Sequence, residues 1–547
     1  MDNLRTLFIF GLLVVSLLLW EAWQNDYVRP QQAANSPAAT ETTTNAAVNN
    51  GDLPELPSTP AAQNLPDVPD SAAPQAVNQI ITIKTDVIDA KLSTQGGDIQ
   101  DLALLNYPVS SDQPDNPVHF LSNKPDEFFV SQSGLRSNKD APTHYSIYRA
   151  DNSHYELQAG QDEIKVPLYW ENDAGVKVIK TYTFKRDSYV VDVDYQVINN
   201  SADIFSAYPY AQFNRNKKAE GSRFIYTYTG PVFSSQGNEY EKVKFDDLDD
   251  KPFSLNVTDG WAAMIEHYFV AAVVPSDETS EKTFYAKALD GGNYTTGIRL
   301  PALSVTTGGE ANTNYELYLG PKKHDRLEKV ATNLQLTVDY GIFTIISEPL
   351  FWIMEWLHKL TGNWGWSIVL LTVLIKLVFF KLSATSYRSM AAMRKLTPKL
   401  ASLKERYGDD KQKFNKAMMD LYRTEKINPL GGCLPILVQM PVFLSFYWVL
   451  VESIELRQAD FIFWLNDLTA MDPYFILPVL FGLSMWFQQT LNPAPQDPAQ
   501  AMVMKFFPLV FTVFFAFFPS GLVLYWVVNN ILSIAQQWYI TRKMDAL

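Results

Sequence analysis

The 547-residue sequence has few of the residues that most metal or catalytic sites require. Its single cysteine, Cys433, excludes an internal disulfide and a zinc site built from several cysteines. None of the six histidines has a second histidine four positions further on, so a helical His-x-x-x-His metal site is excluded. The phosphate-binding motif G-x-x-x-x-G-K-[ST] is also missing, which argues against ATP hydrolysis. We therefore predict no cofactor and no enzymatic activity.

Charge is distributed unevenly along the chain. Residues 22–340 hold 26 basic and 43 acidic side chains, whereas residues 381–427 hold 12 basic and 5 acidic ones. Apolar runs separate the two segments. Cytoplasmic loops of membrane proteins are enriched in Lys and Arg. The pattern therefore indicates a membrane protein with a basic cytoplasmic loop and a large acidic exported region.

The apolar runs predict six membrane spans, since a helix needs ~20 apolar residues to cross a bilayer. An N-terminal signal-anchor helix is expected at 1–24, with a cleaved signal peptide as the alternative. Pro519-Ser520-Gly521 divides the last run into two helices, each about 20 Å long, which would thin the membrane locally. The spans after the anchor are expected at 364–382, 428–451, 474–491, 505–518 and 519–536.

The basic excess at 383–427 assigns that segment to the cytoplasm and both chain termini to the same side. Its apolar residues fall at helical spacing on either side of a Gly-Asp-Asp turn, which predicts a helical hairpin. The methionines of this hairpin suit contacts with apolar peptides, and filling gaps between the two helices explains them equally well. The remaining connections are a periplasmic loop at 452–473, a cytoplasmic loop at 492–504 and a short cytoplasmic tail at 537–547.

The exported region has three predicted parts. Residues 25–79 are rich in Ala, Pro, Asn and Thr, a composition that indicates a flexible linker. Residues 80–340 contain many short segments of alternating polarity, which predict an antiparallel β-sandwich. Residues 341–363 have apolar residues at helical spacing, with Trp352 and Trp356 four apart, and predict an amphipathic helix in the membrane interface. A connecting helix packed on the sandwich is the alternative.

Lys376 is the only charged side chain inside any of the C-terminal spans. A lysine at the bilayer centre costs roughly 2.5–3.5 kcal/mol on insertion scales, so it requires compensation. One interpretation is snorkelling toward the cytoplasmic end of the span. The other is a water-filled cavity lined by polar residues at similar depth, for which the candidates are Thr372, Gln439, Asn529, Ser533 and Gln536.

Four motifs resemble the YidC/Oxa/Albino family of membrane protein insertases, in its Gram-negative form. They are Asn428-Pro-Leu-Gly-Gly-Cys-Leu-Pro435, Gln439-Met-Pro441, Glu455-Leu-Arg-Gln-Ala459 and Phe518-Pro-Ser-Gly-Leu-Val-Leu-Tyr525. The resemblance implies an α-helical inner-membrane protein with six transmembrane helices, a five-helix insertase core and a large periplasmic antiparallel β-sandwich domain.

The same resemblance implies a positively charged hydrophilic groove, open to the cytoplasm and to lipid. Lys376 matches the groove cation, which is usually Arg in the family. Thr372, Gln439 and Ser533 match its polar lining, and Tyr525 and Trp526 match a substrate-contacting pair. The implied partners are nascent inner-membrane proteins, the lipid bilayer, the Sec translocon with its accessory subunits and, weakly because the tail is short, the ribosome.

Two other functions remain open on the sequence alone. A membrane-anchored periplasmic carbohydrate-binding protein would also carry a β-sandwich, although aromatic alternation more often reflects core packing. A small-solute transporter would favour internal repeats, and we see none. Binding to DNA is not predicted.

Overall fold

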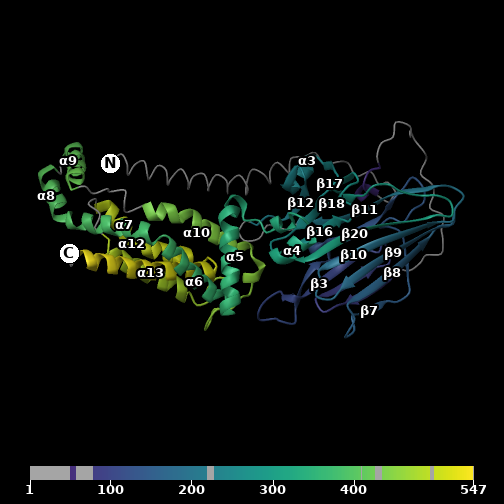
Figure 1. The fold of residues 1–547 in the computed structure, drawn as a ribbon, viewed down its shortest axis with the longest axis horizontal. Helices are drawn as coiled ribbons and strands as arrows, with labels where there is room; N and C mark the ends of the chain where they lie inside the picture. The colour runs from purple at the N-terminus through teal and green to yellow at the C-terminus, as the bar shows by residue number, and fades with distance from the viewer. Residues whose placement is uncertain are drawn as a thin grey trace, which may run out of the picture. The chain divides into compact units, whose positions relative to one another are not determined.

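The computed structural model describes residues 50–56, 78–217, 227–407, 410–425, 434–492 and 498–545. Two compact units divide the chain, Met1–Gly51 and Asp52–Leu547. The predicted anchor at 1–24 and most of the predicted linker at 25–79 lie outside the described residues. The second unit contains a β-rich domain, whose strands end at Pro321, followed by a series of helices (Figure 1).

The first sheet of the β domain has eleven strands. Its order is β14-β17-β18-β11-β5-β3-β2-β1-β7, with β4 beside β3 and β19 beside β11. Neighbouring strands are antiparallel except for the pair β1 and β7. The bounds are β1 Ile80–Lys84, β2 Ile88–Ser93, β3 Ile99–Pro108, β4 Pro117–Leu121, β5 Phe129–Arg136, β7 His154–Glu156, β11 Phe205–Asn216, β14 Phe253–Val257, β17 Lys282–Ala288, β18 Asn293–Arg299 and β19 Leu303–Val305.

The second sheet has nine antiparallel strands, in the order β13-β12-β15-β16-β20-β10-β9-β8-β6. The bounds are β6 Arg149–Ala150, β8 Glu163–Glu171, β9 Val176–Lys185, β10 Val190–Asn199, β12 Gly230–Ser235, β13 Asn238–Lys242, β15 Trp261–Ile265, β16 Phe269–Pro275 and β20 Glu310–Pro321. Three short helices accompany the sheets, namely η3 Pro125–Glu127, α3 Phe245–Asp250 and α4 His324–Val330.

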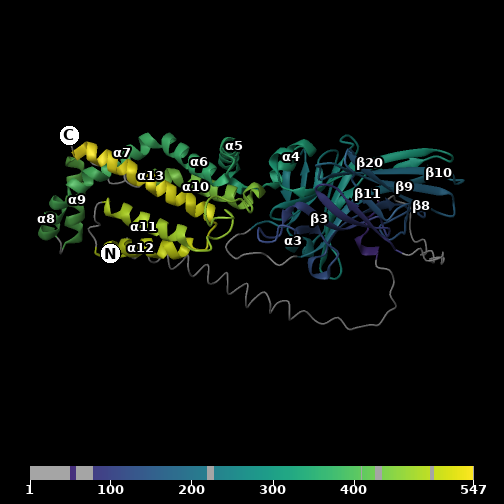
Figure 2. The ribbon, with the colours of Figure 1, turned by 90° about the horizontal axis from the view of Figure 1, so that it is seen from below.

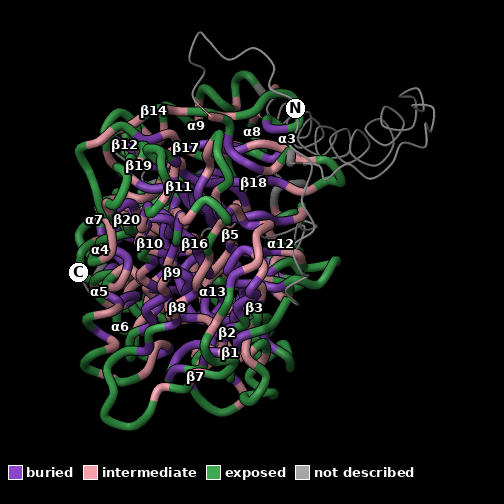
Figure 3. The backbone as a smooth tube through the Cα atoms, turned by 90° about the vertical axis from the view of Figure 1, so that its right-hand side faces the viewer, coloured by how far each residue is buried: buried purple, intermediate pink, exposed green. Residues whose placement is uncertain are grey.

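Alternating polarity explains how the two sheets pack. Along β10, Val191, Val193, Tyr195 and Val197 are buried and the residues between them are more exposed, as expected when successive side chains point to opposite faces. Side chains from both sheets join one apolar cluster, and the strands β9, β10 and β16 are largely buried (Figure 3). The predicted antiparallel β domain is therefore present.

Helices make up the rest of the described chain. After η4 Leu334–Thr337 and η5 Gly341–Phe343 come α5 Thr344–Thr361, α6 Trp364–Val378, α7 Phe380–Lys395, α8 Thr397–Tyr407, α9 Lys411–Thr424, α10 Leu434–Glu452, η7 Ile454–Leu456, α11 Ile476–Thr490, α12 Pro498–Phe515 and α13 Ser520–Asp545. The long helix α13 packs against α6, α7 and α11 (Figure 2). Helix α5 ends at Gly362, whose φ of 66° provides the left-handed turn that commonly closes a helix.

Helix boundaries differ from the expected ones in three places. Helix α6 stops at Val378, and α7 continues after a 68° bend. The expected single helix before the hairpin turn is divided at Leu396, where Pro398 near the start of α8 suits a new helix. Helices α12 and α13 have 18 and 26 residues, so they are longer than the short spans expected from the sequence.

In the described part of the chain, no single helix meets the length and hydropathy criteria for a membrane span. The bent pair formed by Trp364–Val378 and Phe380–Lys395 meets them together.

Candidate functional site

Lys376 lies in the last turn of α6 and is buried, with 8% of its surface exposed. Its Nζ donates a hydrogen bond to Ser533 Oγ on α13 over 2.7 Å. Ser533 Oγ in turn donates to the Asn529 carbonyl, also over 2.7 Å. Among the described residues, no carboxylate forms an ion pair with Lys376. The cation is therefore enclosed with a hydroxyl as its recorded hydrogen-bond partner.

The other predicted lining residues make contacts of their own. Thr372 is buried one turn before Lys376, and its hydroxyl donates to the Ile368 carbonyl of its own helix. Asn529 is buried one turn before Ser533. Gln439 lies on α10 and is half-buried, and no hydrogen bond between it and Lys376 is recorded. The structure thus joins Lys376 to Ser533, and Ser533 in turn bonds the main-chain carbonyl of Asn529.

Tyr525 and Trp526 are packed among aromatic rings near the start of α13. Tyr525 is buried, and its ring centroid lies 4.9 Å from that of Phe446 on α10. Trp526 contacts Phe443 at 4.9 Å and Phe481 on α11 at 6.0 Å. Its indole Nε1 is buried and has no hydrogen-bond partner. The pair therefore joins α13 to α10 and α11.

Several buried polar residues of this helical region were missed by the sequence reasoning. Asn530 Nδ2 donates to Ser484 Oγ of α11 over 3.1 Å. Gln537 Nε2 donates to the Leu491 carbonyl over 3.3 Å. On α7, which was assigned to the hairpin, Ser383 and Tyr387 are buried. The polarity of the last helix gave a signal for Asn530 and Gln537, but the sequence gave none for the burial of α7.

Apolar side chains cover much of the outer surface of these helices. Such extended apolar exposure is unusual for a protein surrounded by water and suits contact with lipid. The most exposed include Leu377, Val378, Val479, Leu483, Trp486, Met502, Leu509, Val510, Val513 and Phe517. Helix α5 exposes Ile345, Trp352, Trp356 and Leu360 on one side and buries Leu350, Met354 and Leu357 on the other.

The end of α10 and the loop after it bind the β domain at a junction with buried charges. Lys322 Nζ pairs with Glu452 Oε2 at 3.3 Å, and their side chains are 1% and 4% exposed. His267 Nε2 donates to the Val451 carbonyl over 2.8 Å. Arg457 donates to the Pro108 carbonyl over 2.8 Å. These bonds hold the end of α10 and the loop after it against the β domain.

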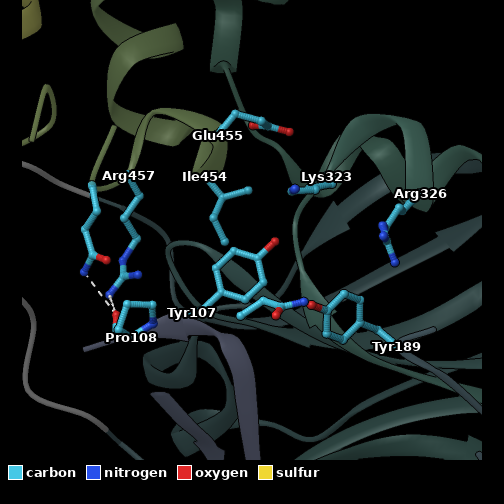
Figure 4. Close-up of a pocket in the computed structure, with 10 residues that line it drawn as sticks. Tyr107, Pro108, Tyr189, Lys323, Arg326, Ile454, Glu455 and Arg457 are labelled. Carbon is cyan, nitrogen blue, oxygen red and sulfur yellow. Dashed lines mark hydrogen bonds between the residues drawn. The ribbon is translucent and has the colours of Figure 1, made fainter. Parts of the chain in front are cut away.

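A cavity of about 260 Å³ lies at this junction (Figure 4). Tyr107, Tyr189, Lys323 and Arg326 line it from the β domain, and Glu455 lines it from the loop. Glu455 Oε2 is buried without a hydrogen-bond partner. Burial raises the pKa of Glu455 to about 7.

The pKa values of two histidines near the junction are lowered rather than raised. Burial lowers the pKa of His267 to about 4, and the same effect lowers that of His324 to about 4. Within the described residues, no group of three or more His, Cys, Asp or Glu side chains is arranged to hold a metal ion.

Comparisons with known proteins cover the whole chain. A family model described as "YidC periplasmic domain" matches residues 80–353, and one described as "60Kd inner membrane protein" matches residues 356–546. A protein of Nitrosococcus oceani named "Membrane protein insertase YidC" is 50% identical over 548 residues, covering 100% of this chain and 99% of that protein. The protein of the same name from Methylococcus capsulatus is 50% identical over 550 residues, covering 100% of this chain and 99% of that protein.

A solved structure described as an active YidC insertase is 19% identical, covers 85% of this chain and 95% of that chain, and has a TM-score of 0.40. This likeness adds nothing to the assignment, which the sequence matches carry. Those matches define the class, inner-membrane proteins with a β-rich periplasmic domain. The chain belongs to the YidC family.

Proposed function

We propose that this chain is a membrane protein insertase and chaperone that acts without enzymatic chemistry. The support is the 50% identity over the full length to proteins named membrane protein insertases. Carbohydrate binding is not favoured, because the family match continues through the helical residues 356–546. The lysine enclosed between α6 and α13 is the observation that gives the proposal a mechanism.

Lys376 is the group that receives the polar end of an incoming segment. A buried ammonium paired with a hydroxyl lacks the counter-charge that would offset its desolvation. A carboxylate on the entering segment supplies that charge, so attraction is strongest for acidic tails. Burial of the apolar part of the segment in lipid, together with the membrane potential acting on its charges, supplies the free energy.

The proposal includes a polar groove and a membrane topology for the chain. Thr372, Gln439, Asn529 and Ser533 form its polar lining, open to the cytoplasm and to lipid. Tyr525 and Trp526 are the substrate-contacting pair of the proposal, and the buried Trp526 indole N–H is left without a hydrogen-bond partner among the helices. Six spans place both termini in the cytoplasm and the β domain in the periplasm, with α5 in the outer interface.

Replacing Lys376 tests the mechanism. In cells depleted of their own insertase, Lys376→Arg should support insertion of a single-span substrate with a short acidic tail, whereas Lys376→Ala should lower it by about tenfold and Lys376→Glu further. Lys381→Ala is the matched control, because Lys381 is exposed on the next helix. Normal insertion by Lys376→Ala at wild-type protein levels would disprove the charge mechanism.

Topology and partners have separate tests. In a Cys433→Ser background, a single cysteine in place of Asp112 should react with an impermeant maleimide added to the periplasmic side. A single cysteine in place of Lys413 should react only after the cells are opened, because that residue lies in the cytoplasm. A photocrosslinker at position 526 should capture nascent membrane proteins. Probes on the β domain and on the hairpin should capture Sec translocon subunits and ribosomal proteins, respectively. Labelling from the opposite sides would refute the topology, and a lack of crosslinks would refute the partners.

A further inference from the structure

Residues 52–55 bind the first sheet of the β domain, although they belong to the segment whose composition predicts a flexible linker. Asp52 Oδ2 accepts a hydrogen bond from His144 Nε2 at 3.0 Å, and Oδ1 accepts one from the Tyr145 hydroxyl at 2.5 Å. Lys287 Nζ donates to the Leu53 carbonyl over 3.0 Å. The Arg299 guanidinium donates to the Glu55 carbonyl. A carboxylate and two main-chain carbonyls are thus held at once.

Apolar contact accompanies these polar bonds. Leu53 is 5% exposed and Pro54 is buried, whereas Glu55 is exposed. Burial of the Leu53 side chain helps to offset the entropy cost of ordering the segment. The segment therefore contacts the β domain with the acidic side chain of Asp52 and the apolar Leu53 and Pro54, whereas the acidic side chain of Glu55 stays in solvent.

The receiving surface is part of the rigid sheet. Arg299 on β18 lies opposite Thr283 on β17, and Lys287 follows four residues after Thr283. Because side chains alternate with period two along a strand, Arg299 and Lys287 stand on the same face. Two cations from neighbouring strands therefore point toward one side of the sheet, where they meet the segment.

The His144 side chain is held in place by the interior of the β domain. This side chain is 1% exposed. The Tyr210 hydroxyl accepts from the His144 backbone N–H at 3.1 Å and lies 2.7 Å from Nδ1. With the hydroxyl hydrogen donated to Nδ1, the Nε2–H points at Asp52. The imidazole is therefore oriented by the interior of the domain, independently of the segment it binds.

The Asp52 carboxyl responds to these neighbours. Its partial burial alone would raise its pKa, but the hydrogen bonds from His144 and Tyr145 lower the pKa below its ordinary value. The bound carboxylate is the charged form, which makes hydrogen bonds of the stronger, charge-assisted kind.

We propose that His144, Tyr145, Lys287 and Arg299 form a peptide-binding site for a short segment that carries an aspartate, and that residues 52–55 of the chain are its resident ligand. The carboxylate-binding pair selects Asp at the first position, and the buried second position selects a leucine-sized side chain. The two cations bind main-chain carbonyls, so they hold the segment without selecting its side chains. We call the four residues the clip site. The clip site does not depend on the role proposed for Lys376 in insertion.

Limited proteolysis of the full-length protein tests the resident ligand. Asp52→Asn should raise the rate of cleavage within residues 52–56 by about tenfold, because the variant loses the charge-assisted hydrogen bonds that hold the segment on the β domain. Strands β17 and β18 should stay resistant to cleavage. The control is Asp112→Asn, an exposed acid on the turn between β3 and β4. Equal cleavage rates in Asp52→Asn and in the control would overturn the proposal.

Binding in trans tests the site itself. A fluorescent peptide with the sequence of residues 50–56 is titrated into full-length protein whose residues 52–55 are replaced by Gly-Ser-Gly-Ser. It should bind this variant at least tenfold more tightly than wild type, where the site is filled. Adding Lys287→Met to the variant, or Asp→Asn to the peptide, should remove most of the gain. Equal affinity for the wild type and the replaced chain would refute a recognition site, whatever the insertion activity.

Discussion

The β domain and the helical region distribute polarity in opposite ways. The β domain encloses valine, leucine and aromatic side chains between two sheets and directs most of its charges outward. The helical region exposes leucine, valine and phenylalanine along α11 and α12 and buries Thr372, Ser533, Asn529 and Lys376. The first pattern suits water as the solvent, and the second suits lipid outside with a polar interior.

Buried lysines make the comparison specific. In the β domain, Lys180 Nζ donates to the Gly96 and Gly97 carbonyls at 2.9 and 3.1 Å, close to the buried Asp98. Its burial lowers its pKa to about 7. At the junction, Lys322 pairs with Glu452. Lys376 has a serine hydroxyl instead. Lys322 thus has a carboxylate partner and Lys180 has two main-chain carbonyls, whereas Lys376 has one hydroxyl, which is the contrast on which its proposed role depends.

The largest expected effect comes from breaking the compensated pair. Lys322→Met leaves the Glu452 carboxylate buried without its partner, which should lower the free energy of unfolding by roughly 3–5 kcal/mol. A denaturant titration in bicelles, followed by proteolysis of the junction, measures the loss. Lys329→Met, on an exposed site nearby, should change it by less than about 0.5 kcal/mol. A loss no larger than that of this control would show that the pair does not stabilise the junction.

A smaller effect is expected from pH. The pKa of Glu455 in the folded protein is about 7, above its ordinary value of 4.5, so its contribution to stability is fully present below pH 4.5 and is lost as the pH rises through 7. Wild type should therefore lose up to about 3 kcal/mol of junction stability over that range relative to Glu455→Gln.

The difference between these two proteins is the quantity to measure, since other groups titrate as well. Lys323, Asp325 and Glu355 also act on Glu455. His267 and His324, whose pKa values are lowered, weaken the junction as the pH falls below 6.5 in both proteins. Parallel pH profiles for wild type and Glu455→Gln would contradict the prediction.

The smallest change in stability is expected at the incompletely compensated lysine. Lys376→Met keeps the length of the side chain and removes a buried charge, so the free energy of unfolding should stay unchanged or rise by about 1 kcal/mol. Insertion of acidic-tailed substrates should fall in the same variant. A loss of stability as large as that of Lys322→Met would place the two lysines in one class and remove the contrast between them.

The sequence predicted the features that depend on local pattern. Alternation such as Tyr189 to Tyr195 gave the strands, and Lys376 was recognised because apolar residues surround it for many positions on both sides. The turn at Pro519-Ser520-Gly521 was found because its residues prevent a continuous helix, and α13 begins there at Ser520.

Features that depend on distant contacts could not be predicted in this way. Lys322 stands in a polar stretch, and only its contact with Glu452, far along the chain, shows that it is buried. The binding of residues 52–55 requires Arg299, which no local composition reveals. The break between α6 and α7 occurs at Phe379, without proline or glycine to signal it, and both helices pack against the distant α13.

That break has an electrostatic consequence for Lys376. Because α6 ends at Val378, the lysine lies in its final turn, the end of a helix that carries partial negative charge. The Phe379 N–H donates to the Ile375 and Leu377 carbonyls, so the residue at the bend closes this last turn. The position of the break therefore places the buried ammonium at the negative end of the α6 dipole, which stabilises a positive charge there.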